Sequence, residues 1–202
     1  MSTAAHALSA GHAPSHAETQ TGIPNGKLAM WLFLASEVMF FTGLIGAYII
    51  LRMSNPAWPG SEGHLSVPMG TINTLVLLCS SATIVFALSA AGRNQIATTR
   101  KWLLLTIVLG FVFLGIKGTE YAAKFHHHIY PSTNVFWSCY FGMTAFHAIH
   151  VIAGIIFNIW VLMYTFSPRL WETRGHRLEL AGLYWHFVDI VWIFLFPLVY
   201  LL

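Results

Sequence analysis

The chain has 202 residues, of which 56% are hydrophobic and only 8% are charged, and its formal net charge is +3. Because an ordinary soluble domain has about 25% charged residues, this composition excludes a soluble globular protein and indicates one embedded in a membrane. The basic residues lie between apolar runs, so the net charge reports membrane orientation and excludes nucleic-acid binding.

The first part of the chain, residues 1–26, is polar and rich in alanine and histidine. It has no apolar core, whereas a cleaved signal peptide needs an apolar segment of about 7–15 residues. We therefore expect a flexible tail, followed by one membrane domain over residues 27–202.

Five apolar stretches follow, each long enough to cross a bilayer as a helix. They cover approximately residues 28–51, 69–91, 102–123, 135–166 and 180–202. In lipid only helices and closed barrels satisfy every backbone hydrogen bond, and runs this long and apolar are helices. The sequence therefore predicts an all-α fold, a polytopic membrane protein built as a bundle of five transmembrane helices.

The lysine and arginine residues predict how these helices are oriented. With five spans, one side of the membrane holds seven of them: Lys27, Arg93, Arg100, Lys101, Arg169, Arg174 and Arg177. The other side holds at most three: Arg52, Lys117 and Lys124. Since cytoplasmic loops are richer in lysine and arginine, the N-terminus is predicted to be cytoplasmic and the C-terminus periplasmic.

Glu37 is the single charged residue inside the first span, about 15 Å beyond Lys27 along the helix axis and near the bilayer midplane. A carboxylate there costs several kcal/mol unless it is protonated, paired or facing a polar interior. No lysine or arginine lies at matching depth, so we expect a protonated carboxyl. Two roles stay open for it: a group bonded to a backbone carbonyl, and a proton relay.

Four further polar residues are predicted near mid-depth, in pairs three residues apart: His147 with His150 on the fourth helix, and His186 with Asp189 on the fifth. Residues at this spacing share a helix face, so each pair is expected to point inward. Helix-to-helix hydrogen bonds explain such groups. Haem ligation by His147 and His186, and a proton relay, are the alternatives.

Charged residues also mark the outer end of the third span. Lys117, Glu120 and Lys124 are spaced for an ion pair at i, i+3 and i, i+4. The three histidines of residues 126–128 come next. Adjacent residues cannot all face one metal ion on a helix, so we expect an interfacial loop without a metal site.

Five motifs occur in order along the spans: SEVMFF, NTLVLLCSSAT, GTEY, TAFHAIHVIAG and YWHFVDIVWIFLFP. Together they resemble subunit III of the haem–copper respiratory oxidases, in its short five-helix bacterial form. The resemblance covers residues 27–202. The family often shows TGFHGxHV on the fourth helix, where this chain has Ala145 and Ala148 in place of the glycines.

The resemblance implies a non-redox accessory subunit of the bacterial inner membrane. It implies direct contact with catalytic subunit I, association with subunit II and other small subunits, and membership of a larger respiratory supercomplex as a further option. Haem and copper would be held by the partner subunits and none by this chain. The subunit would stabilise subunit I and sustain proton uptake and oxygen reduction.

The same resemblance implies a V-shaped cleft filled by phospholipids, with the first two helices leaning away from the rest. It places the mid-membrane carboxylate at Glu37 and an intramembrane polar network at His147, His150, His186 and Asp189. By position, the candidates for binding lipid headgroups are Arg93, Lys101 and Arg177.

Other functions stay open from the sequence. The quinol-oxidase branch often carries aspartate at the position of Glu37, so glutamate favours the cytochrome c branch. A quinol oxidase subunit and a homologue associated with nitric oxide reductase are alternatives within the family. A free-standing membrane haem protein and a proton channel are alternatives from other classes.

Overall fold

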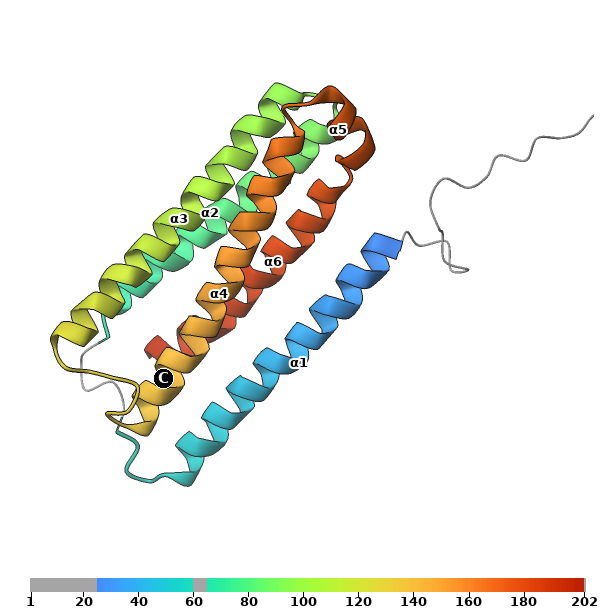
Figure 1. Cartoon of the computed structure of the whole chain (residues 1–202). Helices are drawn as coiled ribbons and strands as arrows, with labels where there is room; N and C mark the ends of the chain where they lie inside the picture. The colour runs from blue at the N-terminus through green and yellow to red at the C-terminus, as the bar shows by residue number, and fades with distance from the viewer. Residues whose placement is uncertain (1–24, 60–64, 202) are drawn as a thin grey trace, which may run out of the picture.

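The computed structural model describes residues 25–59 and 65–201, and this part of the chain is helical without any strand. Six helices and a terminal π-helical turn follow one another in the described part of the chain (Figure 1). They are α1 (Asn25–Ser54), α2 (Val67–Gly92), α3 (Ile96–His126), α4 (Val135–Tyr164), α5 (Pro168–Arg174), α6 (Arg177–Phe196) and η1 (Pro197–Leu201). The expected tail lies almost wholly outside the described residues.

Within residues 25–59 and 65–201, five helices are long and apolar enough to cross a membrane, namely α1, α2, α3, α4 and α6 with its π-helical continuation. This confirms the predicted helical membrane bundle. Most helix ends differ from the expected bounds by one to six residues, and two of these differences change how a segment is assigned. α3 continues to His126, so the first histidine of the expected loop is helical. The connection after α4 contains the short helix α5, which begins with Pro168, a residue suited to the first turn of a helix.

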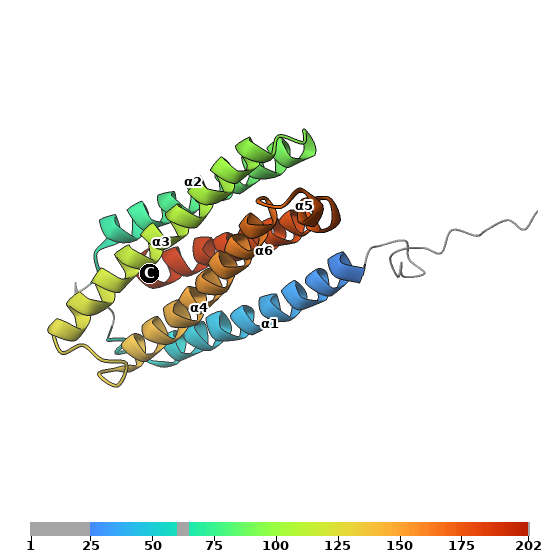
Figure 2. The same ribbon diagram turned by 45° about the horizontal axis from the view of Figure 1, so that its top comes forward.

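The spans form three layers (Figures 1 and 2). α2 and α3 make the most extensive helix contact, α4 and α6 form the middle layer against them, and α1 lies outermost, contacting α6 and α4. This corrects the expectation that the first two helices lean away together. α2 belongs to the four-helix core, and α1 alone stands at the edge.

The difference between α1 and α2 follows from their surfaces. α2 buries a face of small and polar residues, and this face bonds to its neighbours: Thr83 Oγ1 lies 2.7 Å from Thr106 Oγ1, and Trp185 Nε1 donates to Ser80 Oγ at 3.0 Å. α1 buries only Phe41 and Tyr48. A Cβ at Gly43 would meet no atom within 4 Å, so no close helix contact forms there.

Trp185 fixes the spacing of the core helices. Its side chain is fully buried between two glycines, Gly110 of α3 and Gly154 of α4. A Cβ at Gly110 would lie 2.9 Å from the indole ring, and one at Gly154 would lie 2.8 Å from it. Only glycine therefore allows α3 and α4 to approach this tryptophan so closely.

Candidate functional site

Glu37 of the outer helix α1 contacts a histidine of the middle layer. Its Oε2 lies 2.9 Å from Nε2 of His150 on α4, and both side chains are largely buried, 19% and 15% exposed. The other ring nitrogen, Nδ1, lies 2.8 Å from the carbonyl oxygen of Phe146. A carbonyl only accepts hydrogen bonds, so Nδ1 carries a hydrogen and donates it.

This geometry fixes how many protons the pair holds. With Nδ1 donating, the contact between Nε2 and Oε2 needs one shared proton. Either a neutral carboxyl donates to a neutral imidazole, or an imidazolium donates to a carboxylate. Both forms carry no net charge, which avoids the cost of an isolated ion in the membrane. The Glu37–His150 pair can therefore hold one proton and move it by a single short transfer.

Aromatic rings surround the pair. Phe41 packs edge-on to the His150 ring at 5.1 Å, and Phe40 packs against Phe146 at 5.2 Å. Tyr184 of α6 donates its hydroxyl to the carbonyl oxygen of His150 at 3.2 Å. The site thus joins α1, α4 and α6 at a point where the surroundings are apolar.

The sequence reasoning missed His150 as the partner of Glu37. It grouped His150 with His147 because residues three apart share a helix face. Three residues turn a helix through about 300°, so the two side chains still differ in direction by about 60°. That angle is enough for His147 to point into the core while His150 reaches α1.

His147 lies in a different environment from His150. It is 1% exposed, and its ring packs against Trp192 at 5.0 Å and Phe113 at 5.6 Å. Neither ring nitrogen has a hydrogen-bond partner within residues 25–59 and 65–201. The polar residues of the fourth and fifth helices therefore do not form one connected network as the sequence analysis expected.

His186 takes its partner from α2. Its Nδ1 lies 2.7 Å from Ser81 Oγ, whereas His147 contacts rings of α3 and α6. Asp189, three residues further along α6, is 3% exposed. Since the two histidines have different neighbours, the geometry does not favour a haem held between His147 and His186. The described residues contain no cluster of three or more metal-ligating side chains.

Three charged residues near the C-terminal end of α3, Lys117, Glu120 and Lys124, form a buried cluster. Glu120 accepts from Lys117 Nζ at Oε2 and from Lys124 Nζ at Oε1, both at 3.0 Å. The sequence analysis expected a local ion pair at the helix end, but these side chains are only 4–7% exposed. The reason is Tyr200 of η1, whose hydroxyl donates to Glu120 at 2.7 Å and holds α3 against the C-terminal end of α6.

Aromatic rings complete this cluster. Lys117 Nζ lies 4.7 Å from the ring centre of Trp192, and Lys124 Nζ lies 4.8 Å from that of Tyr140. Such cation–π contacts compensate part of the lost hydration of a buried ammonium group. The signal that could have revealed the cluster is the pair of tyrosines, Tyr140 and Tyr200, but their positions depend on the packing of α4 and η1.

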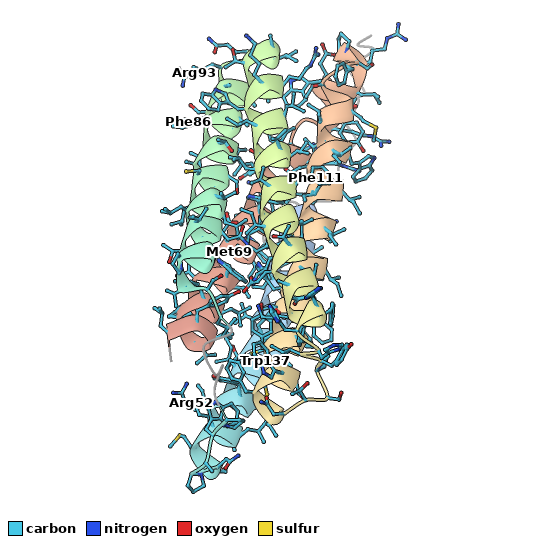
Figure 3. All side chains as sticks on the ribbon, turned by 90° about the vertical axis from the view of Figure 1, so that its left-hand side faces the viewer. Arg52, Met69, Phe86, Arg93, Phe111 and Trp137 are labelled. Atoms are coloured by element: carbon cyan, nitrogen blue, oxygen red, sulfur yellow. The ribbon has the colours of Figure 1, made fainter. Side chains whose placement is uncertain are left out.

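The three candidate lipid-binding residues have different surroundings at one end of the bundle. Figure 3 shows Arg93 at this end and Arg52 at the opposite one. Arg93 donates to Ser89 Oγ at 2.7 Å and so closes the last turn of α2. Lys101 is exposed at the start of α3. Arg177 Nη1 lies 3.4 Å from the hydroxyl of Tyr164.

Comparison with known proteins agrees with this architecture. The chain is 37% identical over 199 residues to cytochrome c oxidase subunit 3 of Thermostichus vulcanus, covering 97% of this chain and 94% of that protein. It is 34% identical to cytochrome c oxidase subunit 3 of Alkalihalophilus pseudofirmus, covering 94% and 93%. Quinol oxidase subunit 3 of Bacillus subtilis is 31% identical, covering 95% and 93%.

The family profile described as cytochrome c oxidase subunit III matches residues 9–202, which is nearly the whole chain. The relatives match at similar length, and the five membrane-spanning helices occur in the order that the sequence motifs predicted. This chain belongs to the cytochrome c oxidase subunit III family.

Proposed function

We propose that this protein is the non-redox accessory subunit of a bacterial haem–copper terminal oxidase. It docks directly on catalytic subunit I, in a complex with subunit II and other small subunits. The observation that carries the proposal is the family match over residues 9–202. In this role the chain stabilises subunit I and sustains oxygen reduction and proton uptake, while haem and copper belong to the partner subunits.

The internal polar groups support a role without a redox centre in this chain. Glu37 pairs with His150, His186 bonds to Ser81, and Glu120 is surrounded by Lys117, Lys124 and Tyr200. These groups are used for contacts between helices. In the Glu37–His150 pair one proton serves both partners.

We place the chain in the bacterial inner membrane, with its N-terminus in the cytoplasm. Two features support this orientation. The connections at the end of the bundle marked by Arg93 carry most of the lysine and arginine residues. Lys27 at the start of α1 also pairs with Glu179 of α6 at 2.7 Å at this same end.

The electron donor of the complex is proposed to be cytochrome c, with quinol as the second candidate. Two of the relatives described above are cytochrome c oxidase subunits and one is a quinol oxidase subunit. Glutamate at position 37 favours cytochrome c as the donor. The haem spectrum and substrate preference of the purified complex would decide between them.

The test is purification through an affinity tag on this chain from detergent-solubilised membranes. Haem-containing subunits should be recovered with it in equal amounts, and the complex should consume oxygen. The chain expressed by itself should show no Soret band and should not conduct protons in liposomes. Haem bound to the isolated chain, or proton conduction without a partner, would replace this proposal by the haem-protein or channel alternative.

A further inference from the structure

A pocket lies where the start of α2 meets the last turns of α3, two helices that run antiparallel side by side (Figure 1). Its volume is about 270 Å³, and its lining includes Ser66 and Met69 at the start of α2 and Glu120, Ala123 and Lys124 of α3. One water molecule takes about 30 Å³ of liquid, so a small ion fits together with a few waters. Ser66 and Met69 are exposed, so the pocket opens to the surface of the protein.

The charged groups beside this pocket carry an excess of positive charge. Lys117 and Lys124 contribute two ammonium groups and Glu120 contributes one carboxylate, and the three side chains are only 4–7% exposed. Within the described residues, the ion pairs of both lysines are those to Glu120 alone. A buried charge without a counter-ion is strongly unfavourable. The cluster therefore requires one more ion to balance it.

The hydrogen bonds of Glu120 indicate that this ion is an anion. Its two oxygens accept from Lys117 and Lys124, and the Tyr200 hydroxyl lies 2.7 Å from both. A metal ion at this carboxylate would displace those bonds and would face two ammonium groups. Lys124 still has a donor to offer, because an ammonium group has three N–H bonds. In the described part of the chain it makes one hydrogen bond, to Glu120, and lies 4.8 Å from the ring centre of Tyr140.

The start of α2 supplies further donors. Ser66 is the N-cap residue, but its side chain makes no capping hydrogen bond. The amide of Met69 belongs to the first turn, where the residue four positions earlier lies outside the helix. This end is also the positive end of the helix dipole, which favours an anion. The negative end of α3 competes less, because the carbonyl oxygens of Ala123 and Lys124 accept from the amide of His127.

We infer that this pocket is a binding site for one small monovalent oxyanion, of the class of formate and bicarbonate. Lys124 donates to one oxygen of the anion, and the Ser66 hydroxyl and the Met69 amide donate to another. The two ammonium groups of the cluster then face two negative charges. The site uses residues of this chain alone, so it does not depend on the proposed role in an oxidase.

The test is thermal unfolding of the protein purified through a tag on this chain, together with the subunits that bind it. Formate replaces the bulky anion lactobionate at constant ionic strength. The unfolding temperature should rise with formate and then level off, because a ligand that binds only the folded state stabilises it. Infrared spectra with carbon-13 formate should show a band of bound formate distinct from that of free formate.

Two variants test the pocket without changing its charge. Ser66→Ala removes one hydrogen bond to the anion and should weaken the apparent affinity for formate about tenfold. Ala123→Leu fills the pocket and should abolish both the formate-dependent stabilisation and the infrared band. Ala122→Leu is the matched control, since Ala122 is an exposed neighbour on α3 that does not line the pocket. It should bind formate as the unchanged protein does.

Three results would overturn the anion site. One is an unfolding temperature that does not depend on formate, and another is equal formate affinity in Ser66→Ala, Ala123→Leu and Ala122→Leu. The third concerns Glu62, the one acidic residue between α1 and α2 in the sequence, which lies outside the described residues. If Glu62→Gln binds formate and the unchanged protein does not, the counter-charge is a carboxylate of this chain and not a free anion.

Discussion

At the scale of single residues, the Glu37–His150 contact decides what the mid-membrane carboxyl can do. The partner of the carboxyl is an imidazole of α4 at 2.9 Å, in place of the backbone carbonyl that the sequence left open. One shared proton satisfies both groups without net charge. The contact therefore links α1 to α4 and can also hold a proton.

We predict that Glu37→Gln leaves assembly and initial oxygen consumption of the complex nearly unchanged. A glutamine amide can donate to a neutral His150 as a protonated carboxyl does, so the helix contact survives. Glu37→Leu leaves His150 unpaired and should destabilise the chain by about 1–3 kcal/mol. Met39→Leu, at an exposed position of α1, serves as the control.

The measurements are thermal unfolding of the complex, initial turnover, and turnover after many cycles. Any loss of activity in the glutamine variant should appear only after many cycles of turnover, because glutamine cannot release a proton. Complete and immediate loss of proton pumping in Glu37→Gln, with normal assembly, would instead make the pair an obligatory relay.

The charged cluster on α3 leads to a second prediction. Glu120→Gln leaves Lys117 and Lys124 buried without a counter-charge, which typically costs about 3–5 kcal/mol. Lys124→Met should cost less, since Glu120 keeps Lys117 and Tyr200. Glu172→Gln on the exposed face of α5 is the control. In thermal unfolding of the complex, Glu120→Gln should lower the stability most, Lys124→Met less, and the control least. Equal destabilisation by Glu120→Gln and Lys124→Met would contradict the arrangement in which both lysines share one carboxylate.

At the scale of helices, the core depends on close contacts that α1 lacks. α2, α3, α4 and α6 approach each other through glycines and small polar residues, while α1 is attached at a few points. Arg100 of α3 fixes the C-terminal end of α4. It donates a hydrogen bond to the Thr165 carbonyl oxygen at 2.7 Å, just after the last turn of that helix. Its positive charge also suits the negative end of the helix dipole.

We predict that Gly154→Ala destabilises the chain whereas Gly142→Ala does not. Both glycines lie on α4, but a Cβ at Gly154 would lie 2.8 Å from the rigid ring of Trp185, and one at Gly142 would meet no atom within 4 Å. Overpacking of this kind typically costs about 1–3 kcal/mol. Unfolding of the purified complex in detergent at increasing temperature measures the difference. Equal stability of the two variants would show that Trp185 can move aside.

At the scale of the whole molecule, membrane orientation is the property most directly tested. Single cysteines at Asn55 or Ser132 should react with a membrane-impermeant thiol reagent from the periplasm, in a background without Cys79 and Cys139. Cysteines at Gln95 or Thr173 should react only after the membrane is opened, because their connections carry the excess of lysine and arginine. The reverse pattern at all four positions would place the N-terminus outside.

The sequence by itself determined the fold class and the family. In lipid, apolar runs of this length satisfy their backbone hydrogen bonds only as helices. The five spans and their order therefore followed from composition and spacing. The motifs around Glu37, His147 and His186 identified the family, which the profile match then confirmed. These features are local, and local features can be read from one chain.

Only the tertiary structure decided which side chains meet. Glu37 and His150 are 113 residues apart, Glu120 and Tyr200 are 80 apart, and Ser81 and His186 are 105 apart. Which helix lies beside which depends on surfaces of several spans at once, such as the small face of α2 and the glycines around Trp185. Side-chain direction changes by about 100° per residue, so a partner on another helix cannot be chosen until the packing is known.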